Sequence, residues 1–464
     1  MPAKIKFLGG VRTVTGSSHL VTTDKSEVLL DAGLFQGHRD QFYTINTTFN
    51  FNPHKLNALL LSHAHIDHCG NLPSLVQKGI RCRIYATAAT RDLCKLMLED
   101  SGKIQEEDTR YLNKINLRLG LPLRKPLYTK KEATRAAKKI RHLSYNQRLA
   151  ITRDIFATFQ DAGHILGSAI IVLEIKEEGR NIRLGYAVDL GRKGLPILND
   201  PAKIKNLDYL VIESTYGGRV HAPIQEAKIK LKDTILRTVE RKGKIIIPAF
   251  TLERTQEIVY YLSELFKEKA IPQIPVYVDS PLATDITDVF TYHADFMDSR
   301  TREAINTGDT PFEFVNLRYI REQRESKILN TDKRPMIILA GSGMCESGRI
   351  LHHLKNNIED SRNTILVVGY MAENTLGRKI VEKEKIVRIF GIEHELNAEV
   401  VVINAFSGHA DKNELLDFVL ASAPLKKVFL VHGDMDQTQA FAATLTQKGI
   451  SNYIPSRDEE ILLD

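Results

Sequence analysis

The stretch LSHAHIDHCGN, residues 61 to 71, places three histidines and an aspartate within six positions, directly after the apolar run ALLL. An apolar run of this kind is typical of a buried strand. In an extended segment alternate side chains point the same way, so His63 and His65 can bind one ion together. Asp67 and His68 lie where the chain turns into a helix expected over residues 71 to 78, and they can face a second ion. A histidine-rich surface loop is the competing interpretation.

Six further segments end an apolar strand with a single acid or imidazole. Residues just past the carboxyl end of a strand lie at the open edge of a sheet, where clefts form. A single histidine after a strand is more often a structural residue than a ligand, but six such strand ends together with the histidine-rich loop indicate a site. They are Asp31 in VLLDAG, His164 in FQDAGHILGS, Asp189 in GYAVDLG, Glu213 in VIESTYG, His409 in AFSGHADK and His432 in FLVHGD.

The residue types in these motifs favour zinc. Imidazole and carboxylate donors without thiolate suit Zn²⁺ in an open hydrolytic site, whereas closed structural sites are rich in cysteine. A carboxylate has two oxygens and can span two ions, which is the role we assign to Asp189. Two ions about 3.5–4 Å apart would hold a hydroxide and the oxygens of a phosphoryl group in line. We therefore expect two Zn²⁺ per chain.

The order of the elements predicts an α/β fold, because short β-branched runs alternate with helical stretches along the chain. A chain of 464 residues exceeds the length at which one core usually keeps growing, so two domains are expected. The strands IPVYVDSP, PMIILAGSGM and NTILVVGY are apolar throughout, as parallel strands covered on both faces are. This second α/β unit looks inserted into the first and not appended to it.

Composition excludes several classes of protein. The chain is 43% hydrophobic and 26% charged, which excludes disordered and fibrous proteins. Its apolar runs are too short to cross a bilayer, and the start MPAKIKFLGG contains no segment of signal-peptide length, so we expect a cytoplasmic protein without a membrane partner. The four cysteines show no C-x-x-C pairing and are interpreted as buried reduced thiols.

Positive charge is concentrated in one segment. The formal net charge is +7, which permits an anionic partner without demanding one. Residues 124 to 141, RKPLYTKKEATRAAKKIR, contain eight lysines and arginines and one glutamate. In isolation this segment is interpreted as a solvated helix face. It becomes a surface that attracts phosphate only if a nuclease site lies nearby.

The motif H-x-H-x-D-H, together with Asp31, His164 and Asp189, resembles the metallo-β-lactamase fold. That fold also hosts lactamases, thioesterases and lactonases, so it leaves the substrate open. The motifs ESTYGGR, SGHADK and VHGD resemble the three additional motifs of the β-CASP nucleases, and PAFTLERTQE, VDSPLA and AGSGMCESGR resemble the domain inserted in that subfamily. The resemblance covers essentially the whole chain. It is strongest to compact bacterial and archaeal members, which are similar to the endonuclease subunit of the eukaryotic cleavage and polyadenylation specificity factor.

The resemblance implies a metallo-β-lactamase αββα sandwich with an inserted α/β β-CASP domain made of a parallel sheet flanked by helices. The first part of the metallo-β-lactamase domain is expected over residues 1–215, the β-CASP domain over 216–398, and the C-terminal part over 399–464. The implied activity is zinc-dependent hydrolysis of RNA, most simply single-stranded RNA, in RNA processing or decay. Endonuclease action leaving a 3′-hydroxyl and a 5′-phosphate is expected, while 5′-to-3′ exonuclease action and a homodimer are left open.

The family's metal ligands carry over residue by residue. The resemblance implies that one zinc is bound by three histidines and the other by an aspartate and two histidines, with Asp189 and a hydroxide between them. Asp67 also counts among the catalytic residues, and Asp31 is implied to orient a ligand histidine. The first ion is assigned to His63, His65 and His164, and the second to Asp67, His68 and His432.

Further residues are assigned to proton transfer and to phosphate. The resemblance implies that His409 protonates the departing 3′ oxygen and that Glu213 is hydrogen-bonded to it, which fixes its tautomer and keeps it cationic. The small residues of AGSGMCESGR leave backbone N–H groups free for an oxyanion, although a plain tight turn explains such a loop equally well. Lys103 stands where the family is associated with a histidine, so any contact of that side chain is in doubt. The phosphate candidates are Arg254, Ser342, Gly343 and Arg349.

Three other functions compete with an RNA nuclease. A thioesterase or lactonase on the same metal core would leave the inserted domain and the basic segment unexplained. A DNA nuclease differs through contacts to the 2′-hydroxyl, which no motif reveals. A non-catalytic RNA-binding scaffold is disfavoured because all seven ligand positions and the Glu213 and His409 pair are present.

Overall fold

The computed structural model describes residues 2–37, 39–177 and 179–464. The chain forms two units, and the first is assembled from segments that precede and follow the second in the sequence. Unit 1 comprises Met1–Gly194, Asp200–Val220 and Gly408–Asp464, and unit 2 comprises Leu195–Asn199 and His221–Ser407. Both units combine helices with sheets, which confirms the α/β class. The domain boundaries expected after residues 215 and 398 stay predictions.

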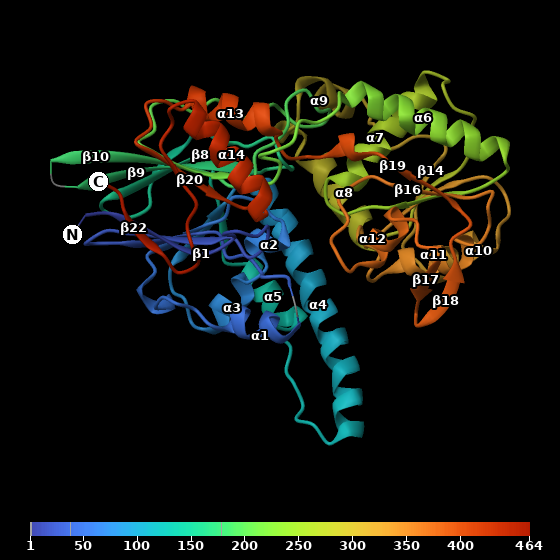
Figure 1. Ribbon diagram of the computed structural model, residues 1–464, viewed down its shortest axis with the longest axis horizontal. Coiled ribbons are helices and arrows are strands. Elements are labelled where there is room, and N and C mark those ends of the chain that lie inside the picture. Colours follow the sequence, from blue (N-terminus) through green and yellow to red (C-terminus); the bar gives the residue numbers. More distant parts are fainter. Residues whose placement is uncertain (1, 38, 178) are drawn as a thin grey trace. The chain divides into compact units, whose positions relative to one another are not determined.

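Unit 1 is built on a pair of mixed sheets (Figure 1). The first sheet has the order β22-β1-β2-β3-β4-β5-β6, in which β3 to β6 run parallel. Its strands are β1 Lys4–Gly9, β2 Ser18–Thr22, β3 Glu27–Leu30, β4 Ala58–Leu60, β5 Arg83–Ala86, β6 Ile140–His142 and β22 Glu460–Leu462. The second sheet has the order β21-β20-β11-β10-β9-β8-β7, in which β10, β11, β20 and β21 run parallel. Its strands are β7 Arg148–Ala150, β8 Ile155–Asp161, β9 Ala169–Glu177, β10 Arg180–Ala187, β11 Tyr209–Glu213, β20 Lys427–Val431 and β21 Asn452–Tyr453.

The core of unit 1 lies between these sheets. Alternate residues of each strand point inward, so Val28 and Leu30 of β3 pack in one cluster with Phe159 of β8 and with Tyr186 of β10. The opposite side chains of the second sheet pack against α13 and α14 in a separate cluster. The result is a helix–sheet–sheet–helix sandwich, with α1, α3 and α5 on the side of the first sheet (Figure 1). The helices are α1 Arg39–Thr47, α2 Ile66–Cys69, α3 Leu72–Gln77, α4 Ala88–Leu119, α5 Lys130–Ala137, α13 Lys412–Ala421 and α14 Met435–Gln447.

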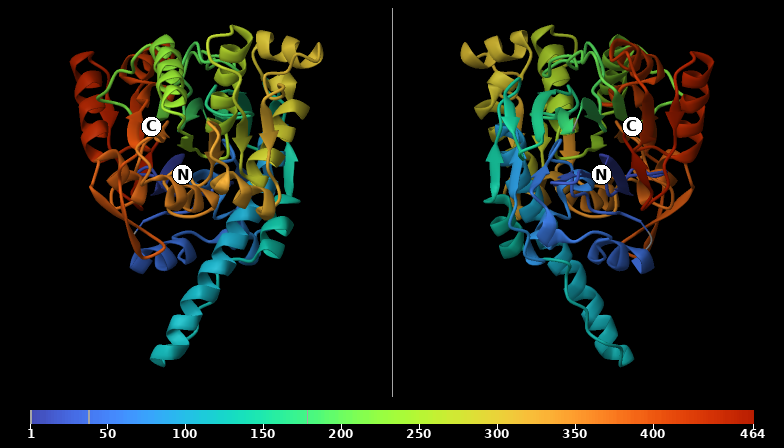
Figure 2. Two further views of the ribbon diagram at one scale, coloured as in Figure 1. Left: turned by 90° about the vertical axis from the view of Figure 1, so that its right-hand side faces the viewer. Right: turned by 90° about the vertical axis from the view of Figure 1, so that its left-hand side faces the viewer.

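Helix α4 is the longest helix in the described part of the chain. Its first turn is capped by the Thr87 hydroxyl, which accepts from the backbone N–H of Thr90, and it ends at Gly120 in the left-handed conformation. The segment that follows runs back beside the helix to α5, where Thr129 and Glu132 form a capping box. The C-terminal half of α4 projects beyond the sheets of its own unit in Figure 2.

Unit 2 contains a parallel sheet with the order β14-β13-β15-β12-β16-β19. The central strands β12, β13, β15 and β16 are buried on both faces, as the sequence predicted for three of them, with α6, α7 and α8 on one side and α10, α11 and α12 on the other (Figure 1). The strands are β12 Ile245–Pro248, β13 Val276–Val278, β14 Leu317–Tyr319, β15 Ile337–Ala340, β16 Thr364–Val367 and β19 Glu399–Val402, with a hairpin of β17 Ile386–Ile389 and β18 Ile392–Glu395. The helices are α6 Ile224–Glu240, α7 Arg254–Lys267, α8 Pro281–Tyr292, α9 Ser299–Asn306, α10 Gln323–Thr331, α11 Arg349–Asn357 and α12 Leu376–Val381.

The side chains of Cys69, Cys82, Cys94 and Cys345 are free thiols, and three of them are buried as expected, whereas Cys82 is half-buried. Over residues 2–37, 39–177 and 179–464, no helix is both long enough and apolar enough to cross a membrane.

Candidate metal centre

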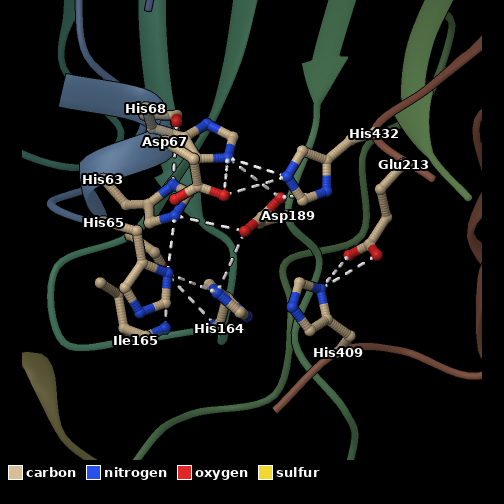
Figure 3. A network of polar contacts seen from close by, with 12 residues as sticks. His63, His65, Asp67, His68, His164, Ile165, Asp189, Glu213, His409 and His432 are labelled. Carbon is tan, nitrogen blue, oxygen red and sulfur yellow. Dashed lines mark hydrogen bonds and ion pairs between the residues drawn. The ribbon is translucent and has the colours of Figure 1, made fainter. Parts of the chain in front are cut away.

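The ends of five strands of unit 1, β4, β8, β10, β11 and β20, and the segment just before α13, which carries His409, bring acids and imidazoles to one place (Figure 3). The five strands belong to both sheets of the unit, and the parallel strands of each sheet end at the same edge. The residues form two potential ligand groups and an adjoining acid–imidazole pair. The first group is His63, His65, His164 and Asp189, the second is Asp67, His68 and His432, and the adjoining pair is Glu213 and His409, which also groups with Asp189.

The first group consists of three imidazoles whose nitrogens face one another. His65 Nδ1 lies 3.1 Å from His63 Nε2 and 3.2 Å from His164 Nε2. Burial lowers the pKa of His63 to about 4 and holds that of His65 well below its usual value, so both rings are neutral. Neutral imidazoles that converge in this way present lone pairs, which is the arrangement that a divalent cation requires.

The second group combines one carboxylate with two imidazoles. His68 Nε2 lies 3.3 Å from His432 Nε2, and Asp67 Oδ2 lies 3.4 Å from the same His432 nitrogen. His65 is the N-cap of the short helix α2, which begins at Ile66 and carries both Asp67 and His68. The turn from strand to helix within this motif therefore directs successive side chains toward different groups.

Asp189 lies between the two groups and presents one oxygen to each. Its Oδ2 lies 3.3 Å from His63 Nε2 and 3.2 Å from His164 Nε2, while its Oδ1 lies 3.4 Å from His68 Nε2 and 3.2 Å from His432 Nδ1. Burial opposes ionisation of Asp189, but the neighbouring imidazoles outweigh it and hold the pKa of the carboxyl well below its usual range. Although it is buried, Oδ1 accepts no hydrogen bond within the described residues, so it has free capacity for a cation.

A buried network orients the second group. Asp31 Oδ2 accepts from His68 Nδ1 at 2.8 Å, which leaves His68 Nε2 to face the group. The same carboxylate accepts from the Ser62 hydroxyl at 2.7 Å and from the Tyr186 hydroxyl at 3.0 Å. Asp31 and His432 adopt φ angles of 59° and 43°, a region that non-glycine residues rarely occupy. Backbone of this kind is held by its surroundings and is common at functional sites.

The first group is oriented by backbone contacts. His164 Nδ1 donates to the Gly408 carbonyl at 3.2 Å, which leaves its Nε2 facing His65. Gly191 has no room for a side chain, since a Cβ atom there would lie 1.8 Å from the Gly163 carbonyl oxygen. The loops that carry His164 and Asp189 therefore pack backbone against backbone.

Glu213 and His409 form a pair beside Asp189 (Figure 3). Both carboxylate oxygens of the fully buried Glu213 accept from His409 Nδ1, at 3.1 and 3.0 Å. Burial opposes the charge on His409, but the Glu213 carboxylate outweighs it and raises the pKa of the imidazole to about 9. His409 is thus a cationic imidazole whose Nε2–H points away from Glu213.

The phosphate candidates lie in unit 2. Arg254 pairs with Glu257, and the Ser342 hydroxyl accepts from two backbone N–H groups of its own loop. Gly343 packs on the Phe250 ring. Arg349 donates to Asp279 at 2.5 Å and to two backbone carbonyls.

Three supporting residues were missed by the sequence reasoning. Ser62 and Tyr186 bind Asp31, and the Thr215 hydroxyl lies 3.3 Å from His432 Nδ1. Ser62 and Thr215 stand next to motif residues, so the neighbouring sequence could have suggested them. Tyr186 has no such signal, because an inward-pointing tyrosine in a strand looks like any core residue. His19, which belongs to none of the motifs, is fully buried between Phe7 and Tyr186.

These observations fit a bound metal. Neutral imidazoles face one another without a bridging group, and a buried carboxylate oxygen between the groups has no hydrogen-bond donor. In each group the candidate ligand atoms lie within 4.8 Å of one another. Imidazole and carboxylate are the donor types of open zinc sites.

Family models match three segments of the chain. They are a metallo-beta-lactamase superfamily domain over residues 20–206, a Beta-Casp domain over residues 255–380, and a Zn-dependent metallo-hydrolase RNA specificity domain over residues 393–455.

Named relatives align with nearly the whole chain. Ribonuclease TTHA0252 of Thermus thermophilus is 36% identical over 96% of both chains. Transcription termination factor FttA of Pyrococcus horikoshii is 33% identical over 99% of this chain and 71% of its own. A solved structure, titled as a protein of unknown function from Enterococcus faecalis, covers 100% of both chains at 13% identity with a TM-score of 0.56, which is a likeness of fold alone.

Proposed function

The chain belongs to the β-CASP family of metallo-β-lactamase-fold nucleases, and from this premise we propose that it is a zinc-dependent ribonuclease acting in RNA processing or decay. The observation that carries the proposal is the convergence of two ligand groups on Asp189, with the Glu213 and His409 pair beside them. A cytoplasmic location accompanies this proposal, because RNA of that compartment is the expected substrate.

The residues divide into holders of metal and a donor of protons. His63, His65 and His164 would hold one zinc ion, Asp67, His68 and His432 a second, and Asp189 would contact both. Bound zinc would polarise the phosphodiester and lower the pKa of a water molecule so that hydroxide is available near neutral pH.

His409 is the proposed general acid. Its Nδ1 donates to Glu213, so its Nε2–H can be given to the departing 3′ oxygen. The expected products are a 3′-hydroxyl and a 5′-phosphate. Because both Glu213 oxygens accept from the ring, removing the carboxylate also removes the fixed orientation of that proton.

The phosphate candidates of unit 2 differ in how far other groups already occupy them. Arg254 and Arg349 already pair with carboxylates, so a phosphate would compete with Glu257 and Asp279 for them. In the loop of Ser342 and Gly343, the Ser342 N–H donates to the Ser347 carbonyl, and two further N–H groups donate to the Ser342 hydroxyl. The N–H of Gly343 is therefore the backbone donor that we propose for a phosphate oxygen.

The test is digestion of a 5′-end-labelled single-stranded RNA by the purified protein, with and without chelator. We expect hydrolysis to stop on chelation and to return with Zn²⁺, with internal fragments as the sign of endonuclease action. Asp189→Ala should abolish cleavage. Asp154→Ala, which removes a buried carboxylate that bonds Thr23 and Ser26, should leave cleavage unchanged. Wild-type cleavage by Asp189→Ala, or turnover of a thioester in place of RNA, would refute the proposal.

The proton donor has its own test. His409→Ala should lower kcat by about 10²–10⁴-fold while zinc content, read by metal analysis, stays at the wild-type value. His142→Ala, at an exposed strand end, is the matched control. Loss of zinc from His409→Ala would make this residue a ligand instead of the acid. Equal cutting of matched DNA and RNA strands would widen the substrate to DNA.

A further inference from the structure

Helix α4 and the segment that follows it form a projecting arm, defined here as residues 109–126 (Figures 1 and 2). The arm is held together by its own hydrogen bonds. Asn113 bonds both the N–H and the carbonyl of Arg124 at 2.9 Å, and Asn116 Nδ2 donates to the Pro122 carbonyl at 2.9 Å. Gly120 reverses the chain with φ of 66°. The arm is therefore an ordered element of unit 1 and presents a defined surface.

All charged side chains of the arm are basic. Its sequence, TRYLNKINLRLGLPLRKP, contains five basic residues and no acidic residue. Within the described part of the chain, no ion pair joins the side chains of Arg110, Lys114, Arg118, Arg124 and Lys125 to a carboxylate. Four of these cations line a groove of about 480 Å³ between α4 and the returning segment. Its remaining lining includes Thr109, Asn113, Leu117, Pro126 and a carboxylate at its base, Glu106, which accepts from the backbone N–H of Lys130.

We propose that this groove binds the phosphate backbone of RNA at a distance from the bond that is cut. Closely spaced cations without counterions are the electrostatic requirement for a polyanion. Tyr111, which is 64% exposed on the same helix, offers an aromatic face on which a base can stack. The inference rests on the proposed function, because it takes RNA as the substrate.

The base of α4 ties the arm to the metal centre within unit 1. The hydroxyls of Thr87 and Thr90 both donate to the Gly167 carbonyl, at 2.7 and 2.8 Å, in the loop that carries His164. From Ala88 to Arg110 the helix rises about 33 Å at 1.5 Å per residue. A stacked strand advances about 3.4 Å per nucleotide, so that distance corresponds to about ten nucleotides. The arm can therefore contact long RNA and not a very short one.

The arm also exposes leucines, which suit a protein partner. Leu117, Leu119, Leu121 and Leu123 are 51–67% exposed. RNA is favoured because the groove is lined by cations and because the arm has no acid to discriminate against a polyanion. A protein or a second copy of this chain is therefore treated as the rival outcome.

The binding test uses the holoprotein in the His409→Ala background, which slows cleavage, with a labelled single-stranded RNA of about 30 nucleotides, longer than the ten-nucleotide reach. The arm variant combines Lys114→Ser, Arg124→Ser and Lys125→Ser. Its matched control combines Lys25→Ser, Lys78→Ser and Lys448→Ser, which removes three exposed cations elsewhere in unit 1.

The expected result is quantitative. Loss of three phosphate contacts should reduce the slope of log affinity against log salt by about 2 and weaken binding about 100-fold near 0.1 M salt. The control triple should keep the wild-type slope. The proposal would be overturned if the arm variant kept the wild-type salt slope, or if the control triple lost as much RNA affinity as the arm variant.

Cleavage in the His409-containing protein separates this inference from the proposed function. The arm variant should raise KM for the long RNA and leave kcat/KM for an RNA of about four nucleotides unchanged, because the short strand does not reach the groove. An equal loss of kcat/KM for the long and the short RNA would refute a contact distant from the cut bond. If no RNA is cleaved by the wild type, the proposed function fails, while the salt slope still decides whether the arm binds RNA.

The leucines provide the last comparison. Leu119→Ser with Leu121→Ser should leave RNA affinity and its salt slope unchanged. The opposite pattern would refute the proposal. If the leucine pair weakens RNA binding or alters the sedimentation of the protein, and the cation triple changes neither, the arm is a protein-docking element.

Discussion

At the residue scale, the buried carboxylate of Asp31 is the support on which the second ligand group depends. It accepts from His68, Ser62 and Tyr186 at once. Asp31→Ala should lower zinc affinity about 10–100-fold, because His68 loses the partner that fixes its tautomer. Tyr186→Phe should have a smaller effect, since it removes one of several donors.

Competition with a chromophoric chelator measures both variants. Asp154→Ala serves as the control, because it removes another buried carboxylate, which bonds Thr23 and Ser26 and none of the metal-centre residues. Wild-type zinc affinity in Asp31→Ala would show that His68 is not held through this carboxylate.

Asp279, a second buried carboxylate, links the stability of unit 2 to pH. It accepts from Arg349 at 2.5 Å, from His353 at 2.6 Å and from Ser326 at 2.5 Å. Burial opposes its ionisation, but these hydrogen bonds outweigh burial and lower the pKa of the carboxyl. Its unfolded pKa is about 3.9, so the stabilisation is complete above that value and is lost as pH falls through the lower folded pKa.

Asp279→Asn should lower the free energy of unfolding of unit 2 by about 3–5 kcal/mol at neutral pH, because it leaves Arg349 without its counterion. The difference from wild type should shrink as the pH falls below about 4. Hydrogen exchange in urea, read on peptides from β13 and α11, measures it. Asp285→Asn, which breaks an exposed pair with Arg321, should cost at most about 1 kcal/mol. A pH-independent difference for Asp279→Asn would contradict the assignment.

The sequence predicted the site residues that end strands but not the supporting residues that lie within strands. His164, Asp189 and His432 stand out because a polar group follows an apolar run. Tyr186 lies inside a buried strand, so only the packing of β10 against β3 reveals that its hydroxyl reaches Asp31. Likewise, the pairing of Arg349 with Asp279 depends on where α11 begins relative to the end of β13, which sequence spacing does not give.

At the scale of elements, the crossing of two loops at Gly191 sets the position of His164. A Cβ at Gly191 would lie 1.8 Å from the Gly163 carbonyl oxygen, so Gly191→Ala must displace the loop that carries His164. We expect a loss of zinc affinity and of thermal stability in unit 1. Gly408→Ala is the matched control, because its Cβ would meet the His164 carbonyl at an ordinary 3.6 Å. Zinc content and thermal unfolding of both variants measure the effect, and equal behaviour of the pair would contradict it.

Helix α4 shows what sequence patterns do not reveal. Residues 88 to 137 are mostly helical, in α4 and α5. The leucines after Tyr111 follow a pattern that normally predicts burial, yet Leu117 is 67% exposed. A helix that extends beyond the sheet on which it packs exposes its apolar residues to solvent. The sequence of the helix does not indicate where the sheet ends.

At the scale of the whole molecule, metal binding should stabilise one unit and not the other. All seven proposed ligands lie in unit 1. Zinc present at about 1,000 times its Kd should stabilise that unit by about 4 kcal/mol. Calorimetry with and without chelator should therefore shift the unfolding of unit 1, and hydrogen exchange should show unit 2 unchanged. An equal shift in both units would mean that they unfold together.

The order of the ligands along the chain has a consequence for synthesis. His432 and His409 follow the whole of unit 2, so a nascent polypeptide that has already emerged through Asp189 lacks both. At about 5–20 residues per second, the ribosome needs roughly ten seconds or more to supply them. A nascent chain that has emerged only as far as unit 2 is thus without a complete second ligand group, and a fragment released at that stage lacks His432.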